Sequence, residues 1–247
     1  MISIDLSGKT ILITGAMGAI AEHMVVRLAA AGAKLVLLDL KPAREAASKL
    51  EEWKVPAESY VYYSLDVTDS ATLTRVVDTA FDRCPMMDTV LGHAGGCGLH
   101  PFASTTEAEF ERIFRFNFFA QTYLARAVFA QWIARKIPGH LIFTSSYVAR
   151  VPHTLIPSYA SAKAALENFA RCMALEYVSS RNSRERDIAR KRRGWQFAQS
   201  VRGGPSVPRV RVAGFPREEE QPGIHRRCVR VPVFAAGIGN QRTNTQR

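Results

Sequence analysis

The sequence predicts an α/β fold: a doubly wound parallel sheet with helices on both faces, its C-terminal strands missing or replaced. Three observations predict it. Strand-like and helix-like segments alternate through the first 180 residues, the first strand-like run ends in a glycine turn, and the alternation stops after Ser180. Repeated strand–helix–strand units imply parallel strands with helices packed on both sides of the sheet.

Short, mostly β-branched or apolar runs predict five strands, because such runs are typical of buried parallel strands. The expected strands are residues 9–14, 34–39, 60–65, 88–91 and 140–144. Apolar residues at helical spacing, with glycine or a capping aspartate at several ends, predict the intervening helices. The expected helices are residues 19–31, 42–53, 69–82, 106–136 and 158–177.

Composition and cysteine usage limit the class of protein. With 47% hydrophobic and 22% charged residues among 247, the chain is a globular protein. Four scattered cysteines form no C-x-x-C pair, so neither a metal site nor a disulfide framework is expected and a reducing compartment fits. The N-terminus resembles no signal peptide and no apolar run reaches about 18 residues, so we expect a cytoplasmic protein without a membrane partner.

The net charge of +11 lies entirely in the C-terminal part. Residues 1–180 carry 17 basic and 17 acidic residues, whereas residues 181–247 carry 16 basic and 5 acidic ones. An arginine-rich segment can bind nucleic acid, but base stacking needs aromatic partners, and here they are dispersed. Nucleic-acid binding is therefore the least favoured function.

The first turn and the second strand suggest a nucleotide site. Residues 14–21 join the first strand to the first helix, where backbone N–H groups and the helix dipole can hold a pyrophosphate. Asp39 ends the second strand, where a carboxylate accepts hydrogen bonds from ribose hydroxyls and repels a 2′-phosphate. An ordinary tight turn and a helix-capping aspartate are the alternatives. Together the two features predict a dinucleotide, NAD rather than NADP.

A second group carries acid–base chemistry. Tyr159 and Lys163 are four residues apart on an expected helix, so they share one face, and an ammonium there stabilises a phenolate and lowers its pKa. Ser146 follows the fifth strand, where ligands of open α/β sheets bind, and its hydroxyl can hold a carbonyl. Surface packing is the alternative for each residue alone.

These residues belong to a longer series. Thr14-Gly15 with Gly18, Asp66-Val67, Ala94-Gly95, Asn117, Ser145-Ser146 and Tyr159-x-x-x-Lys163 follow one another at characteristic spacing. In order and spacing, the series resembles the short-chain dehydrogenase/reductase family over about residues 1–180. The resemblance implies NAD(P)-dependent interconversion of an alcohol and a carbonyl on a Rossmann-type sheet.

The resemblance also implies roles. Tyr159 is expected to be the general acid/base, Lys163 to lower its pKa and hold the nicotinamide ribose, Ser146 to orient the carbonyl, and Asn117 to support a proton relay. The expected cofactor-binding residues are Gly15, Met17, Gly18, Ala19, Ile20, Asp39, Asp66, Val67, Ala94, Gly95, Tyr159 and Lys163. A homodimer or homotetramer packed through helices 106–136 and 158–177 is implied as well.

Two departures from the family pattern lie within the matching part. The first of them, together with the absence of the family's Pro-Gly turn after residue 180, favours an alternative, a catalytically impaired or non-catalytic nucleotide-binding relative. Ala19 and Ala21 stand where the family has glycines, and each adds a methyl group beside the phosphate turn. The family's N-N-A-G after the fourth strand is replaced by Gly-His-Ala-Gly, with His93 expected to be structural rather than catalytic.

The C-terminal part departs most. Residues 1–180 are expected to form the dinucleotide-binding and catalytic domain, and residues 181–247 an arginine-rich, poorly ordered tail. A one-base frame shift lets the codons of residues 181–191 and 228–244 encode segments that resemble the family's missing elements. We therefore expect a frameshift, a splice variant or a gene-model error. If the chain folds as written, five strands leave an open edge, and poor solubility and weak or no turnover are expected.

Overall fold

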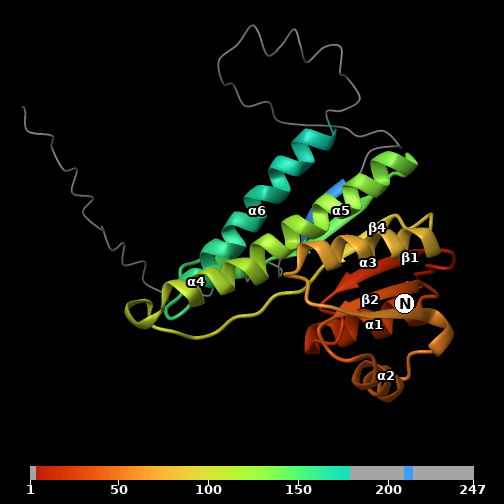
Figure 1. Ribbon diagram of the computed structural model, residues 1–247, viewed down its shortest axis with the longest axis horizontal. Helices are drawn as coiled ribbons and strands as arrows, with labels where there is room; N and C mark the ends of the chain where they lie inside the picture. The colour runs from red at the N-terminus through yellow and green to blue at the C-terminus, as the bar shows by residue number, and fades with distance from the viewer. Residues whose placement is uncertain (1–3, 179–208, 214–247) are drawn as a thin grey trace, which may run out of the picture. The chain divides into compact units, whose positions relative to one another are not determined.

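The computed structural model describes residues 4–178 and 209–213, which form a parallel α/β sheet structure (Figure 1). The strand order is β3-β2-β1-β4-β5-β6, and every neighbouring pair is parallel. The strands are β1 (Thr10–Thr14), β2 (Lys34–Asp39), β3 (Tyr60–Ser64), β4 (Thr89–Gly92), β5 (His140–Thr144) and β6 (Arg209–Ala213). The predicted doubly wound fold is confirmed.

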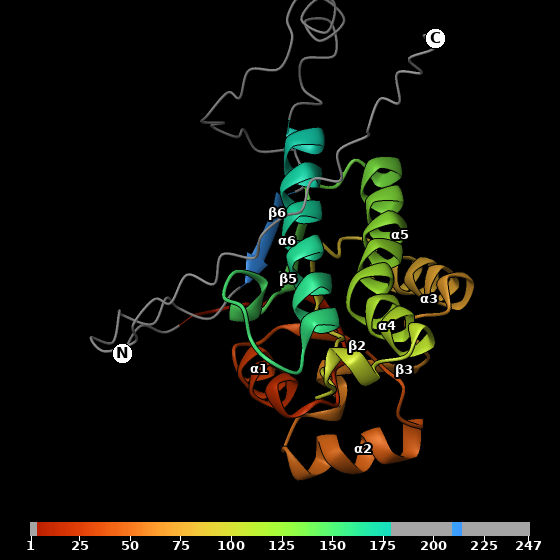
Figure 2. The same ribbon diagram turned by 90° about the vertical axis from the view of Figure 1, so that its left-hand side faces the viewer.

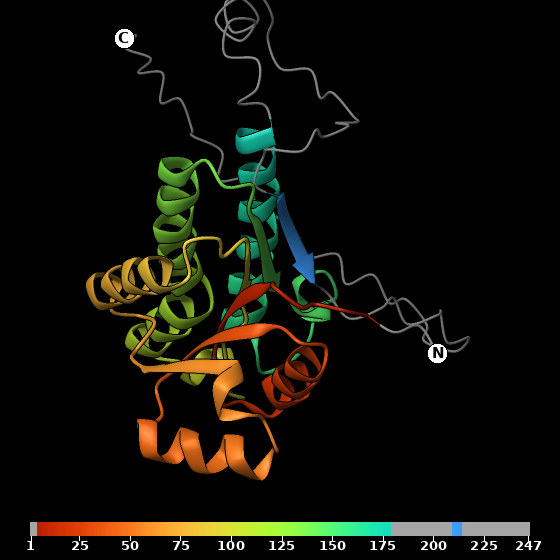
Figure 3. The ribbon, with the colours of Figure 1, turned by 90° about the vertical axis from the view of Figure 1, so that its right-hand side faces the viewer.

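Alternate residues of the central strands point to opposite faces, and each face has its own core. Ile11 and Ile13 of β1 lie in one buried cluster with side chains of α1 (Ala19–Ala30) and α2 (Ala43–Glu52). Leu12 lies in the other, with side chains of α3 (Ser70–Arg83), α5 (Ala120–Arg135) and α6 (Pro157–Val178). Figures 2 and 3 show these two helix layers on either side of the sheet.

Local signals account for where several helices begin. The Asp69 carboxylate accepts hydrogen bonds from two N–H groups in the first turn of α3. Pro157 is the first residue of α6, a position at which a helix does not use the N–H group that proline lacks. Short 3₁₀ turns occupy η1 (Ala57–Ser59), η2 (Phe102–Ser104) and η4 (Tyr147–Ala149). No helix within the described residues is both long and apolar enough to cross a membrane.

The long helix predicted over residues 106–136 contains a wide turn. It consists of α4 (Glu107–Phe114), a π-helical turn η3 (Arg115–Phe119) and α5. Inserted π turns of this kind often occur at functional sites. Here the turn carries Asn117, one of the predicted site residues.

The expectation of a sheet that ends at the fifth strand is wrong. β6 pairs with β5 from His140↔Arg209 to Thr144↔Ala213 and belongs to the same compact unit as the other strands. The Arg-Val-Arg-Val run alternates with period two, but over too few residues to stand out from its arginine-rich surroundings. The exposed edge of β5 supplies the main-chain partners that make it a strand. The predictions for residues 179–208 and 214–247, including poor order and a shifted reading frame, lie outside the described residues.

Gly15 is required by its surroundings. Its φ of +67° is left-handed, and a Cβ there would lie 2.8 Å from the Cα of Ala94. Gly8 has a similar φ of +77° but nothing within 4 Å of its Cβ position. We expect Gly15→Ala to lower the free energy of unfolding by about 1–3 kcal/mol more than Gly8→Ala does, because only Gly15→Ala adds a steric clash. Urea denaturation of both variants measures the difference, and equal losses would contradict the close approach.

Candidate active site

The predicted site residues gather at one edge of the sheet. In a parallel sheet, the carboxyl ends of all strands lie along the same edge, where open α/β sheets bind ligands. The glycine turn follows β1, Asp39 ends β2, Asp66 follows β3, Ala94 follows β4 and Ser146 follows β5. The strand topology therefore brings together residues that are more than 100 positions apart in the sequence.

The glycine turn leads into a helix end that has no side-chain cap. Gly18 is the N-cap of α1 and makes no side-chain capping bond, so the first N–H groups of the helix have no side-chain partner. Gly18, Ala19 and Ile20 are exposed at this end. Ala21, in contrast, is fully buried and contributes its methyl group to the packing of α1. Of the two substituted glycine positions, only residue 19 is exposed at this end of the helix.

Asp39 links the second strand to this turn. Its Oδ2 accepts a hydrogen bond from the Met17 N–H at 3.0 Å, and its Oδ1 accepts one from the Lys41 N–H at 3.1 Å. The half-buried carboxylate is thereby held beside the glycine turn. Sequence reasoning predicted the position of Asp39 but not its hydrogen bond to Met17, which orients both groups.

Asp66 and Val67 follow the edge strand β3. Asp66 is exposed, and its Oδ1 accepts a hydrogen bond from the Thr68 N–H at 2.8 Å. Val67 is buried in a small cluster with Ala94 and Ala120. The segment after β3 therefore packs against the segment after β4, near the glycine turn.

The end of β4 is held by two side chains, those of Thr14 and Gln121, to which the sequence analysis gave no role. The Thr14 hydroxyl accepts hydrogen bonds from the N–H groups of both His93 and Ala94, each at 3.1 Å. The Gln121 side-chain amide, from α5, donates to the Ala94 carbonyl. A side chain at Gly92 would collide with Gln121, so the family's first asparagine has no room here. Neither contact has a local sequence signal.

His93 is hydrogen-bonded to the neighbouring strand. Its Nδ1 shares a hydrogen bond of 2.8 Å with the Thr144 hydroxyl, at the end of the neighbouring strand β5. Burial, and then the nearby positive charge of Lys163, lower the pKa of His93. The imidazole is therefore favoured in its neutral form, suited to accepting or donating one hydrogen bond within the sheet edge.

Asn117 is fully buried in the π turn, and both ends of its side-chain amide are hydrogen-bonded. Its Nδ2 donates to the carbonyls of Gly96, at 2.8 Å, and Ile113, at 3.0 Å, while its Oδ1 accepts from the Gly96 N–H. A Cβ at Gly95 would lie 2.8 Å from Asn117 Oδ1 and 3.1 Å from Lys163 Nζ. Asn117 and Lys163 thus approach the same glycine from two helices.

Ser146, Tyr159 and Lys163 come together where β5 meets α6. The Lys163 ammonium lies 5.6 Å from the centre of the Tyr159 ring and donates to the Thr144 carbonyl at 2.9 Å. The Ser146 hydroxyl lies near enough to the Tyr159 phenol to lower its pKa. The arrangement combines a hydroxyl that can hold an oxygen, a phenol that can transfer a proton and a buried cation beside it.

The pKa values of the pair differ from expectation in one respect. Burial lowers the pKa of Lys163 to about 8. Burial raises the pKa of Tyr159, the hydrogen bond from Ser146 lowers it, and the charge of Cys97 raises it, with an upward net shift. A lowered phenol pKa was expected from Lys163, but in the protein alone burial is the larger effect, because desolvation disfavours the phenolate.

The lowered pKa of Lys163 predicts a pH dependence of stability. Between about pH 8 and its ordinary value of 10.5, the unfolded state binds more protons than the folded state, so stability rises with pH. Below about pH 8 this contribution is constant. We expect the free energy of unfolding of the wild type to rise relative to Lys163→Met from about pH 8 to pH 10, where tyrosines begin to titrate. A flat difference in denaturation experiments would contradict the burial of this ammonium.

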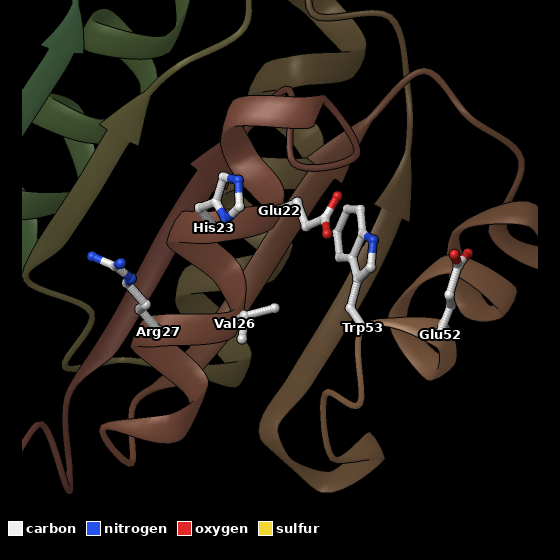
Figure 4. Close-up of a pocket in the computed structure, with 6 residues that line it drawn as sticks. All are labelled: Glu22, His23, Val26, Arg27, Glu52 and Trp53. Atoms are coloured by element: carbon white, nitrogen blue, oxygen red, sulfur yellow. The ribbon is translucent and has the colours of Figure 1, made fainter.

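The hollows on the described part of the chain include two of interest. One, of about 340 Å³, lies between α1 and the end of α2, and its lining residues in Figure 4 include none of the predicted site residues. The other, of about 170 Å³, lies between residues 96–98 and 112–117 and is lined by Asn117. Only the second adjoins the group formed by Asn117, Tyr159 and Lys163.

A parallel sheet with helices on both faces and a glycine turn after β1 defines a doubly wound α/β protein. The sequence matches the family described as short chain dehydrogenase over residues 9–181. The chain belongs to the short chain dehydrogenase family.

Characterised relatives agree with this membership. A versicolorin reductase of Emericella nidulans is 32% identical over 175 residues, which cover 69% of this chain and 64% of the relative. The 7alpha-hydroxysteroid dehydrogenase of Escherichia coli is 29% identical over 187 residues, covering 76% and 72%. The chain thus spans less than two thirds of the length of the versicolorin reductase.

Solved structures agree on the fold. A short chain dehydrogenase from Mycobacterium smegmatis superposes with a TM-score of 0.64 over 71% of this chain and 75% of that chain, at 23% identity. At this identity, the likeness concerns the fold alone. The predicted family and fold class are confirmed.

Proposed function

We propose that the protein is an NAD(P)-dependent oxidoreductase that interconverts an alcohol and a carbonyl, with Tyr159 as the general acid/base. The observation that carries the proposal is the convergence of Ser146, Tyr159 and Lys163 at the junction of β5 and α6. It lies at the sheet edge that also carries the phosphate turn.

The residues present fit a nicotinamide dinucleotide. The uncapped N-terminus of α1 offers N–H groups to a diphosphate, and the half-buried Asp39 carboxylate offers acceptors to ribose hydroxyls. A 2′-phosphate there would meet the charge of Asp39, which favours NAD over NADP. Asp66 and Val67 would contact the adenine, and Ala94 and Gly95 would line the same site. When bound, the nicotinamide supplies the hydride acceptor or donor.

The chain's own residues handle the proton. In the direction of reduction, the Ser146 hydroxyl holds the substrate carbonyl oxygen and the Tyr159 phenol donates its proton to that oxygen as hydride reaches the carbon. The Lys163 ammonium stabilises the phenolate that remains, which regains its proton from solvent. Asn117 orients the backbone around Gly96, beside the route by which the proton is replaced.

A homodimer or homotetramer in the cytoplasm is the assembly we propose. Phe119, Ile133 and Leu175, from the helical stretches that the resemblance assigns to subunit packing, expose 43%, 58% and 59% of their surface. The three cysteines that the structure describes are free thiols, which suits a reducing compartment. Gel filtration at several protein concentrations tests the assembly.

The experiment that tests the function measures oxidation of NADH with 1-decalone, a bicyclic ketone, by the wild-type protein and by Tyr159→Phe. Binding of NADH is measured separately by calorimetry. Binding with turnover that depends on Tyr159 supports the oxidoreductase. Binding without turnover would favour the non-catalytic relative, which the alanines in the phosphate turn suggest, and absence of binding would contradict both functions.

A further inference from the structure

The end of β5 and the residue after it are hydrogen-bonded to α6. The Thr144 carbonyl accepts a hydrogen bond from Lys163 Nζ at 2.9 Å, and the Ser145 hydroxyl donates one to Glu167 Oε1 at 2.8 Å. The next residue, Ser146, lies near enough to Tyr159 on α6 to lower the pKa of its phenol. Lys163 and Tyr159 belong to the proposed active site, whereas Glu167 does not. The bond between Ser145 and Glu167 needs an explanation, because Glu167 lies one helical turn beyond Lys163 and has no part in the proposed reaction.

Glu167 is a buried charge with partners on both oxygens. Its side chain is 6% exposed. Oε1 accepts the hydrogen bond from the Ser145 hydroxyl, and Oε2 accepts one from Arg150 Nε at 2.8 Å, with Arg171 Nη1 at 3.9 Å. A carboxylate removed from water to this extent is costly unless it is paired and hydrogen-bonded, and losing one partner destabilises the other.

The two shorter contacts enclose the segment that carries Ser146. Ser145 precedes Ser146 directly, and Arg150 follows the 3₁₀ turn η4 that Ser146 caps. One carboxylate on α6 therefore holds both ends of residues 145–150. Tyr159 lies on the same helix, two turns before Glu167.

We propose that Glu167 is a positioning residue whose carboxylate fixes residues 145–150 on α6 and so sets the distance between Ser146 and Tyr159. The proposal rests on the proposed acid–base role of Tyr159. Both oxygens are needed: one holds the residue before Ser146, and the other holds the residue that closes the turn.

The test compares Glu167→Gln with Glu167→Asp and the wild type. Glutamine keeps one acceptor for Ser145 but turns an amide NH₂ toward Arg150. We expect kcat for reduction of 1-decalone with NADH to fall about 10- to 100-fold, because small misplacements of reacting groups have effects of this size. The KM for NADH stays near the wild-type value. Aspartate keeps the charge on a shorter side chain and is expected to restore part of the rate.

The pH profile separates positioning from loss of folded protein. The hydrogen bond from Ser146 lowers the pKa of Tyr159. When this bond is loosened, oxidation of 1-decalol, which needs the phenolate, reaches its half-maximal rate at higher pH. Asp78→Ala is the matched control, because it removes a 2.7 Å side-chain hydrogen bond from Gln131 that links α3 and α5 away from the site. This variant is expected to lose stability while its pH profile stays that of the wild type.

A measurement without turnover keeps the two proposals separate. Hydrogen exchange of the peptide covering residues 145–150, without nucleotide, is expected to be faster in Glu167→Gln than in the wild type or Asp78→Ala. Arg150→Ala removes one partner of Glu167 through a side chain that is 65% exposed, so it tests the same link if Glu167→Gln fails to fold. If the wild type oxidises no NADH, the proposed function fails, and hydrogen exchange alone then decides whether Glu167 fixes residues 145–150. Unchanged exchange, or an unchanged pH profile in an active variant, would overturn the positioning role.

Discussion

Tyr159→Phe is expected to lower kcat for NADH-dependent reduction of 1-decalone by about 10²- to 10⁴-fold, the range that general acid–base catalysis supplies. The variant loses only the phenol oxygen, so the ring remains under the Lys163 ammonium, 5.6 Å from Nζ in the wild type. NADH affinity is expected to stay close to that of the wild type. Steady-state kinetics and calorimetry on the same preparations measure the two quantities.

Tyr147→Phe is the matched control for this variant. Tyr147 lies next to Ser146 in sequence, but its side chain is exposed and its ring packs against His153. Loss of its hydroxyl is expected to leave kcat near the wild-type value. A similar loss of rate in both variants would assign the effect to the loop rather than to proton transfer. A Tyr159→Phe protein with wild-type kcat would remove the phenol from the mechanism.

Asp39→Asn is expected to reduce the preference for NADH over NADPH. We expect the wild type to bind NADH about 10- to 100-fold more tightly, because a 2′-phosphate beside a fixed carboxylate adds like-charge repulsion. Asparagine removes the charge and cannot accept hydrogen bonds from both Met17 and Lys41, so NADH affinity falls while NADPH affinity rises. Calorimetric titration with each nucleotide measures the ratio.

The control removes the same charge at the proposed adenine contact, next to the ribose that Asp39 would bind. Asp66→Asn is expected to weaken both nucleotides to a similar extent, because the two share the adenine and differ only at the ribose phosphate. Equal affinities of the wild type for NADH and NADPH would contradict the predicted preference. A ratio that changes equally in both variants would show that total charge, rather than the position of Asp39, sets it.

Local patterns were sufficient to predict most of the fold. The first five strands and the helices between them are bounded by glycine turns, a capping aspartate and changes of hydrophobic period, all of which act within a few residues. The parallel topology then determines where the strand ends meet. Each of five site residues ends or follows a different parallel strand, so their position at one edge of the sheet follows from the strand topology alone: Gly15, Asp39, Asp66, Ala94 and Ser146.

Other features depend on contacts distant in sequence. The Gln121 side chain on α5 donates a hydrogen bond to the Ala94 carbonyl after β4, and the Glu167 carboxylate accepts one from Ser145, 22 positions earlier. Because the partners are distant in sequence, no local sequence pattern predicts either bond. β6 was missed for a related reason, since five residues acquire strand structure from a neighbour more than 60 positions earlier. The direction of the shift in the pKa of Tyr159 depends on burial, which spacing along a helix does not reveal.

The pairing of β6 with β5 also bears on how such a sheet tolerates change. Main-chain hydrogen bonds between parallel strands use groups that nearly every residue carries, so an edge strand accepts a partner largely without regard to its side chains. The sixth position in this sheet is filled by a segment in which no family motif was recognised. The edge that carries the candidate site is built from the first five strands, and it can therefore be retained while the sequence that completes the sheet is exchanged.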